Sequence, residues 1–207
     1  AWVANQGGAR ALFFDAMLAP LVAQIAPQLR HVEFFVALGG APDVKLPKKT
    51  FSYDAFIAGG RERDWEILDE NAACGLCHTS GTTGDPRGVL YSHRSNMLEA
   101  FIGAQTPALR MTALDVVLPA VPMFHANFWG LNFIAPMTGA SLVLPGRKLD
   151  PMSLYKLLAR EKVTISAGVP SVLLPLLDHM KAHKLSLPHL KRVAIGGAAV
   201  PRALIRA

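Results

Sequence analysis

The stretch best equipped for chemistry is the run of residues 77–93, CHTSGTTGDPRGVLYSH. Its residues 79–86 hold two Gly, three Thr, one Ser and one Pro. Glycines permit positive φ and close approach of the backbone, so N–H groups and hydroxyls here can converge on an anion. Arg87 adds a permanent cation whose planar fork suits phosphate oxygens. The run therefore predicts a phosphate-binding loop.

The spacing of this loop differs from that of the Walker A motif. Walker A places Gly-Lys-Ser/Thr after a glycine and four further residues, whereas Pro86 stands five residues after Gly81. Taken alone, a cluster of Gly, Ser and Thr is also compatible with a plain turn. The run is denser than a turn requires, which favours phosphate binding.

The elements around the loop follow an α/β pattern. An apolar run at 72–77 predicts the strand before the loop, and Ser92 predicts the N-cap of a helix to about residue 105. Strands are predicted at 116–121, 141–145, 163–166 and 191–195. Helices are predicted from 130 to 137, after the Asp150–Pro151 cap, and over 172–183, where Pro175 indicates a kink or late start. We expect an α/β fold with a mostly parallel sheet flanked by helices on both faces.

The segment 1–70 is a less regular lead-in to the part that spans 71–207. Short buried strands are predicted at 11–14 and 32–38, with a helix between them that Asp15 caps and that runs to about Ile25. Residues 39–64 are rich in Gly, Pro and charge, which predicts loop around a short helix near 53–57.

Glycines follow several predicted strands, at Gly146, Gly168 and the pair Gly196–Gly197. Ligands of open α/β sheets bind at the carboxyl edge of the strands, and glycine lets a flat ligand approach the backbone there. Ordinary strand-to-helix turns would have the same composition, most plainly at Gly168. The pair Gly196–Gly197 is the better candidate for a ligand loop.

Cys74 and Cys77 spell C-x-x-C, which invites a redox or zinc interpretation. In a strand three residues span about 10 Å, whereas a disulfide needs Cα atoms within about 7 Å. A zinc site would need further ligands. We predict that both cysteines are packing residues, and two cysteines without a disulfide framework indicate a reducing, cytoplasmic setting.

Charge and hydropathy argue against two further classes of protein. The net charge is +6, but the basic residues are spread over loops and helix ends and not interleaved with aromatics, so we expect no nucleic-acid partner. Residues 116–146 contain no Asp, Glu, Lys or Arg, a length that could cross a bilayer. Four prolines interrupt this stretch, so we expect a buried strand, loop and helix, with no transmembrane segment. The same stretch could supply a homodimer interface.

Three blocks of the sequence resemble the adenylate-forming superfamily of acyl-CoA synthetases, luciferases and peptide-synthetase adenylation domains. They are TSGTTGDPRGVLYSHRSN (79–96), PMFHANFWG (122–130) and LPHLKRVAIGGAAVP (187–201). The tryptophan after the histidine in the second block resembles the fatty-acyl-CoA synthetase branch. The resemblance covers nearly the whole chain, which is similar to a fragment of the large N-terminal domain.

The resemblance implies an AMP-forming acid–thiol ligase that uses ATP, Mg²⁺ and CoA on a medium- or long-chain fatty acid. Arg87 and His125 would be catalytic, with Thr79 near the magnesium, and His125 and Trp129 would contact the acyl substrate. The nucleotide would be held by Thr79, Ser80, Gly81, Thr82, Thr83, Gly84, Gly196, Gly197 and Ala198.

The sequence departs from the family pattern in two places, where Arg87 replaces the common lysine and His78 replaces the common tyrosine. The family's Tyr-Gly-x-Thr-Glu motif, its ribose-binding Thr-Gly-Asp and its C-terminal catalytic domain are absent from these residues. We therefore expect the 207-residue chain by itself to be inactive as a ligase. A non-catalytic nucleotide-binding module and, less favoured, a basic nucleic-acid-binding domain are the alternatives.

Overall fold

The computed structural model of the protein describes residues 1–64, 66–79, 84–107 and 109–205. The chain divides into two units, each described by itself. The first comprises Ala1–Asp69 and His78–Val89, and the second comprises Glu70–Cys77 and Leu90–Ala207.

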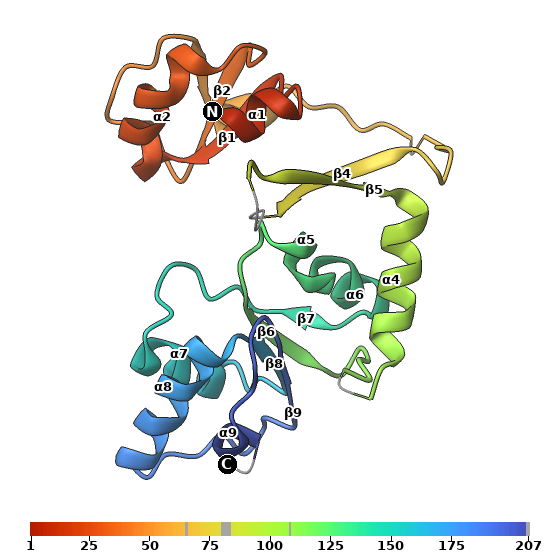
Figure 1. The fold of residues 1–207 in the computed structure, drawn as a ribbon, viewed down its shortest axis with the longest axis vertical. Helices are drawn as coiled ribbons and strands as arrows, with labels where there is room; N and C mark the ends of the chain where they lie inside the picture. The colour runs from red at the N-terminus through yellow and green to blue at the C-terminus, as the bar shows by residue number, and fades with distance from the viewer. Residues whose placement is uncertain (65, 80–83, 108, 206–207) are drawn as a thin grey trace. The chain divides into compact units, whose positions relative to one another are not determined.

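The first unit contains a parallel sheet of three strands, β1 (Ala11–Asp15), β2 (Phe34–Leu38) and β3 (Lys49–Ser52), in that order (Figure 1). Side chains alternate across the sheet, so Phe14, Phe35 and Ala37 enter a core on one face. That core includes Ala19 and Val22 of α2 (Ala19–Ile25). The opposite face carries a cluster of aromatic rings, Phe13, Phe34, Phe51 and Phe56.

The lead-in helices differ in part from expectation. Asp15 accepts a hydrogen bond from Met17 N, but it begins a 3-10 helix, η1 (Ala16–Leu18), and the α-helix begins only at Ala19. A second 3-10 turn, η2 (Ala26–Gln28), follows α2. Pro20 in the first turn of α2 explains the restart, since its missing N–H would be unpaired there anyway.

Two short helices complete this unit. The predicted helix at 53–57 is confirmed as α3 (Tyr53–Ile57), which Ser52 caps. The strand β3 before it was not expected, because its sequence KTFS contains one large apolar residue. The helix α1 (Trp2–Gln6) begins the chain.

The strands β4 (Ala73–Thr79) and β5 (Arg87–Ser92) pair as a two-stranded sheet on either side of the predicted phosphate loop. Ser92 caps α4 (His93–Gln105), as expected, and its side chain and that of Ser95 form a reciprocal capping box.

The second unit is built on a four-stranded parallel sheet in the order β7-β6-β8-β9. These strands are β6 (Val116–Ala120), β7 (Ser141–Leu142), β8 (Ile165–Gly168) and β9 (Arg192–Ile195). The helices of this unit after α4 are α5 (Ala126–Trp129), α6 (Leu131–Thr138), α7 (Pro151–Arg160), α8 (Pro170–Ala182) and α9 (Arg202–Ile205).

Helices cover both faces of this sheet (Figure 1). On one face Val117, Ile165 and Ala167 pack with Leu131 and Ile134 of α6. On the other face the strands pack against α7 and α8, through Leu118, Ala120, Leu154, Leu158, Leu173 and Leu176. The expected α/β class with a parallel sheet between helices is confirmed. Among the described helices, none is both long and apolar enough to span a bilayer.

Candidate functional site

The base of the predicted phosphate loop is formed by the ends of β4 and β5. Thr79 Oγ1 donates a hydrogen bond to the Arg87 carbonyl at 3.4 Å, and Arg87 itself is exposed at the start of β5. Gly84 has φ +157°, and among the described residues other than its chain neighbours no atom lies within 4 Å of the position that a Cβ would occupy. The other predicted loop residues, Ser80, Gly81, Thr82 and Thr83, lie outside the described part of the chain.

His78, which departs from the family pattern, connects the loop to the start of the chain. Its Nε2 lies 2.8 Å from Gln6 Oε1, and its ring meets the Trp2 ring edge-on, with centroids 6.3 Å apart. Both partners belong to α1 in the same unit. These two contacts hold His78, the residue directly before Thr79, against α1.

The block that contains His125 and Trp129 forms a left-handed turn, where a helix was expected only from Gly130. The φ angles of Ala126, Asn127, Phe128 and Trp129 are +45°, +49°, +61° and +55°, and that of Gly130 is +70°. A left-handed residue other than glycine costs roughly 1–2 kcal/mol. Four in succession make α5 a strained segment, of the kind that concentrates at functional sites.

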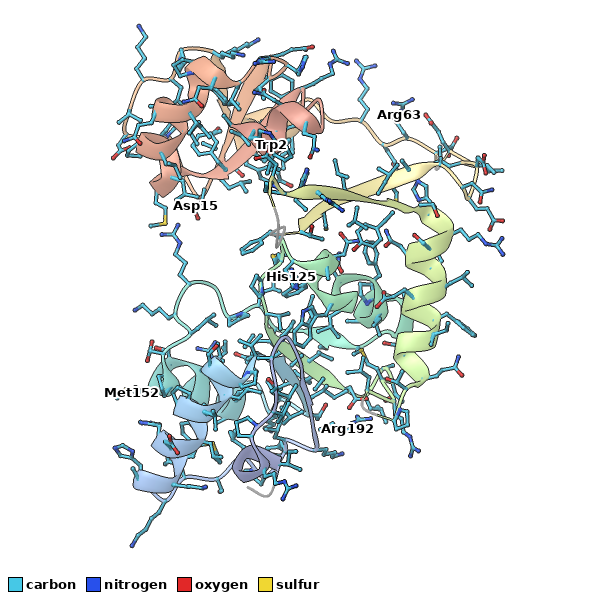
Figure 2. All side chains as sticks on the ribbon, in the orientation of Figure 1. Trp2, Asp15, Arg63, His125, Met152 and Arg192 are labelled. Carbon is cyan, nitrogen blue, oxygen red and sulfur yellow. The ribbon has the colours of Figure 1, made fainter. Side chains whose placement is uncertain are left out.

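The turn directs its side chains to different surroundings. Phe128 is buried in the core that the four-stranded sheet forms with α6. His125 stands exposed at the N-cap of the turn (Figure 2). Trp129 is partly buried against the same core.

Trp129 also lies against the glycine pair at the carboxyl end of β9. A Cβ on Gly196 would stand 3.2 Å from Trp129 Cη2, and one on Gly197 would stand 3.0 Å from Val169 Cγ1. Gly197 also has φ +79°, so both positions favour glycine. By contrast, a Cβ on Gly168 would stand 3.1 Å from Leu173 Cγ, which ordinary packing of a helix on a strand explains. The structure thus brings Trp129 to the predicted ligand loop, and Ala198 follows as an exposed residue.

The C-x-x-C cysteines are free thiols, and they form hydrogen bonds. Cys77 Sγ donates to Asn127 Oδ1 at 3.0 Å, and Asn96 Nδ2 donates to Cys74 Sγ at 3.0 Å. The expectation that both are packing residues is therefore incomplete. Within the described residues, no group of three or more His, Cys, Asp or Glu side chains could hold a metal ion.

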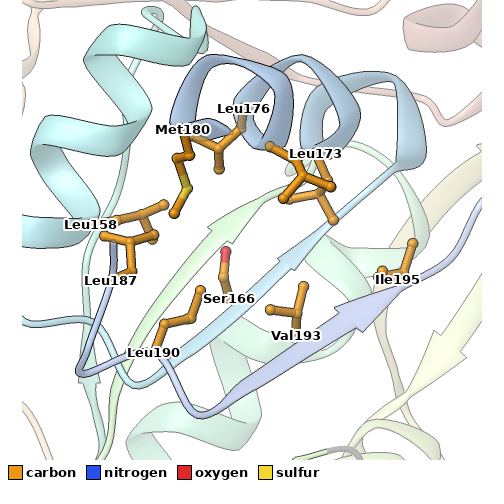
Figure 3. Close-up of a pocket in the computed structure, with 10 residues that line it drawn as sticks. Leu158, Ser166, Leu173, Leu176, Met180, Leu187, Leu190, Val193 and Ile195 are labelled. Atoms are coloured by element: carbon orange, nitrogen blue, oxygen red, sulfur yellow. The ribbon is translucent and has the colours of Figure 1, made fainter. Parts of the chain in front are cut away.

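A separate apolar cavity of about 270 Å³ lies between α8 and the strands β8 and β9 (Figure 3). Its polar lining residue, Ser166, donates to the Leu118 carbonyl at 2.9 Å. Ser166 and Val193 alternate along their strands with Ile165, Ala167 and Ala194, which pack on the Trp129 side. The cavity therefore belongs to the face opposite Trp129.

Two carboxylates that the sequence did not single out occupy structural positions. Asp115 is 6% exposed and accepts hydrogen bonds from Arg192, Thr164 and Thr112. Burial favours a raised pKa for Asp115, but these hydrogen bonds outweigh it and lower the pKa. Partial burial raises the pKa of Glu99, whose carboxylate lies over Gly130. In the sequence, the structural role of Asp115 could have been suspected from its position as a single acidic residue directly before an apolar strand.

The chain matches known acyl-CoA ligases along its whole length. It is 42% identical over 207 residues to a 3-methylmercaptopropionyl-CoA ligase of Ruegeria lacuscaerulensis and covers 38% of that protein. It is 42% identical over 205 residues to a long-chain-fatty-acid–CoA ligase of Thermus thermophilus, with 37% covered. It is 40% identical to a medium-chain-fatty-acid–CoA ligase of Ectopseudomonas oleovorans, with 38% covered. The chain thus spans less than two fifths of these relatives.

Solved structures agree on the fold. A long-chain-fatty-acid-CoA ligase from Archaeoglobus fulgidus superposes with a TM-score of 0.81 at 23% identity, over 99% of this chain and 39% of that one. An anthranilate CoA ligase in complex with anthranoyl-AMP gives 0.81 at 22% identity, over 98% and 39%. The family model for AMP-binding enzymes matches residues 1–207, and the chain belongs to that family.

Proposed function

We propose that this chain is part of an AMP-forming acid–thiol ligase that activates a medium- or long-chain fatty acid. The observation that carries the proposal is the packing of Trp129 against Gly196 and Gly197 within one unit. It joins the block predicted to contact the acyl group to the loop predicted to contact adenine. The names of the long-chain and medium-chain relatives support the same substrate class.

The reaction has two steps. The fatty-acid carboxylate attacks the α-phosphorus of ATP, forming an acyl-adenylate and releasing pyrophosphate. The CoA thiol then attacks the acyl carbonyl carbon and displaces AMP, forming the thioester. The enzyme would thus take ATP, a fatty acid and CoA as its partners.

The phosphate loop would act in the first step by stabilising negative charge. As the bond to the α-phosphorus breaks, charge grows on the departing pyrophosphate, and a preorganised cation or N–H donor stabilises it. Thr79, Gly84 and Arg87, with the intervening loop residues, are the groups we assign to this role.

Mg²⁺ would neutralise phosphate charge when bound, and the donor chemistry at Thr79 fits it. The Thr79 hydroxyl donates a hydrogen bond to the Arg87 carbonyl, which leaves the lone pairs of Oγ1 for a hard cation. Thr79 is the residue that we assign to hold the ion, together with the phosphates.

In the acyl part of the site, His125 would contact the carboxylate and Trp129 the start of the alkyl chain. His125 is exposed next to the turn, and Trp129 presents an apolar indole beside the glycine pair. Gly196, Gly197 and Ala198 would lie against adenine, because the absence of large side chains permits a flat ring to approach. We further propose a cytoplasmic homodimer.

The test is pyrophosphate release by the full-length protein with a series of straight-chain acids. We expect release with medium- or long-chain acids. Trp129→Ala should change their rank order and leave the KM for ATP nearly unchanged. If Trp129 serves only the core, the variant should instead lose on the order of 3–5 kcal/mol of stability with the rank order intact. ATP binding without turnover of any acid would contradict the proposal and favour a non-catalytic nucleotide-binding module.

A further inference from the structure

Four polar side chains in the second unit form a continuous chain of hydrogen bonds, which we term the Asn clasp: Cys77, Asn127, Asn96 and Cys74. Cys77 Sγ donates to Asn127 Oδ1 at 3.0 Å. Asn127 Nδ2 donates to Asn96 Oδ1 at 3.2 Å, and Asn96 Nδ2 donates to Cys74 Sγ at 3.0 Å. Asn96 is 8% exposed, so the centre of the clasp is shielded from water.

The clasp connects three elements that are distant in the sequence. Both cysteines lie on β4, Asn96 lies in the first turn of α4, and Asn127 lies in the left-handed turn. A Cβ added at Gly75 would stand 3.8 Å from Asn127 Oδ1, so the amide lies close to this glycine of the strand. Both polar atoms of the Asn127 side chain are thus held by the strand and the helix.

The turn needs such a restraint because its backbone is strained. Asparagine tolerates the left-handed conformation, but Ala126, Phe128 and Trp129 adopt it against their preference. Burial of Phe128 and the contact of Trp129 with Gly196 hold the C-terminal half of the turn. The clasp holds Asn127, which lies in the sequence between the exposed His125 and the buried Phe128.

We propose that Asn127 is a positioning residue, fixed by the clasp, that sets the directions of His125 and Trp129 toward the acyl substrate. This inference rests on the function proposed above for those two residues. It gives the C-x-x-C cysteines a role as hydrogen-bonding groups: the Cys77 thiol is a donor and the Cys74 sulfur an acceptor.

The first test is spectroscopic and does not depend on catalysis. In the full-length protein, Trp2→Phe and Trp65→Phe, with any tryptophan outside this chain also replaced, would leave Trp129 as the reporter. We expect Cys77→Ala and Asn127→Ala to shift its emission toward the red, because the indole loses its fixed contact with Gly196. Cys77→Ser, which keeps a donor, should restore most of the native spectrum. Unchanged emission in both alanine variants would overturn the proposal.

The second test measures acid selectivity. We expect Cys77→Ala and Asn127→Ala to lower kcat/KM for the best acid by about 10–100-fold and to alter the rank order of acids, the scale of misplacing a substrate contact. The KM for ATP should stay within about twofold, and Cys77→Ser should recover most of the loss. Leu76→Ala, an exposed neighbour on β4, is the matched control and should behave like the parent protein.

The outcomes separate the inference from the proposed function. If the parent protein activates no acid, the proposed function is wrong, but the emission of Trp129 still shows whether the clasp fixes the position of its indole. If acids are activated but the cysteine and asparagine variants lose only thermal stability, with selectivity unchanged, the positioning role is wrong. Should Asn127→Ala fail to fold, the comparison of Cys77→Ala with Cys77→Ser tests the positioning role by itself.

Discussion

Arg87 illustrates how far residue types alone can specify chemistry. The loop composition predicted an anion site, and the structure leaves Arg87 exposed at the first position of β5, immediately after the loop. The role of His78 could not be predicted, because its partners Gln6 and Trp2 lie more than seventy positions earlier in the chain. The clasp could not be predicted for the same reason, since 22 to 50 positions separate the residues that it joins by hydrogen bonds.

Arg87→Ala in the full-length protein should slow acyl-adenylate formation by about 10²–10³-fold, the scale of losing one preorganised donor. The cause is a contact that strengthens as pyrophosphate departs, so kcat falls and not affinity alone. Arg87→Lys should restore most of the rate. Single-turnover kinetics of each step give the readout, and thioester formation from preformed acyl-adenylate should be nearly unaffected. Equal damage to both steps would show that Arg87 is structural.

At the scale of elements, the strong periodic patterns predicted the right type of structure but not its limits. The strand predicted at 141–145 ends at Leu142, and the strand predicted at 163–166 runs from Ile165 to Gly168. Helix α8 begins at Pro170, because proline fits the first helical position. It continues through Pro175, where the sequence had indicated a kink or a late start. The left-handed turn at 126–129 could not be predicted, since three of its four residues disfavour that conformation.

Gly130, between this turn and α6, should tolerate alanine worse than Gly146 does. Both have left-handed φ, +70° and +66°, and alanine there costs about 1 kcal/mol. A Cβ on Gly130 would also clash with the Glu99 carboxylate, which would have to move, whereas apart from its chain neighbours no atom of the described residues lies within 4 Å of a Cβ on Gly146. Gly130→Ala should therefore lower the free energy of unfolding more than Gly146→Ala, as measured by denaturant titration.

A double-mutant cycle isolates the contact with Glu99. In a Glu99→Ala background the two glycine substitutions should cost nearly the same, because the steric term has been removed. A difference that persists in that background would show that the penalty at Gly130 does not come from the carboxylate.

For the whole molecule, a partly buried charge pair stabilises the four-stranded sheet. Arg192 of β9 donates to Asp115 Oδ1 at 2.5 Å and to the Arg110 carbonyl at 2.8 Å. Thr164, directly before β8, donates to the same carboxylate, and its Oγ1 accepts a hydrogen bond from Val116 N at the start of β6. The pair therefore joins the starts of β6, β8 and β9. Removing one partner of a fully buried pair costs roughly 3–5 kcal/mol because the other charge is left unpaired, and we expect a smaller loss here because Arg192 is partly exposed.

Asp115→Asn should therefore destabilise the protein most at neutral pH. The folded state holds the pKa of Asp115 below its ordinary value, so the carboxylate stabilises the fold above the unfolded pKa of about 3.9. That contribution is lost as the pH falls through the lowered folded pKa. The difference between the unfolding free energies of parent and variant, measured from pH 7 to pH 2.5, should narrow toward the acidic end. A gap that is constant with pH would exclude ionisation of Asp115 as the cause.

The division of the chain into units has a consequence for the order in which it folds. The boundaries fall inside β4, between Cys77 and His78, and inside β5, between Val89 and Leu90. The first unit is thus discontinuous in sequence, and a nascent chain cannot complete it until Val89 has left the ribosome. Contacts such as His78 with Gln6 close long loops and form slowly. During synthesis the first unit therefore stays incomplete until the predicted phosphate loop has emerged, although the three strands of its sheet, β1, β2 and β3, are all made earlier.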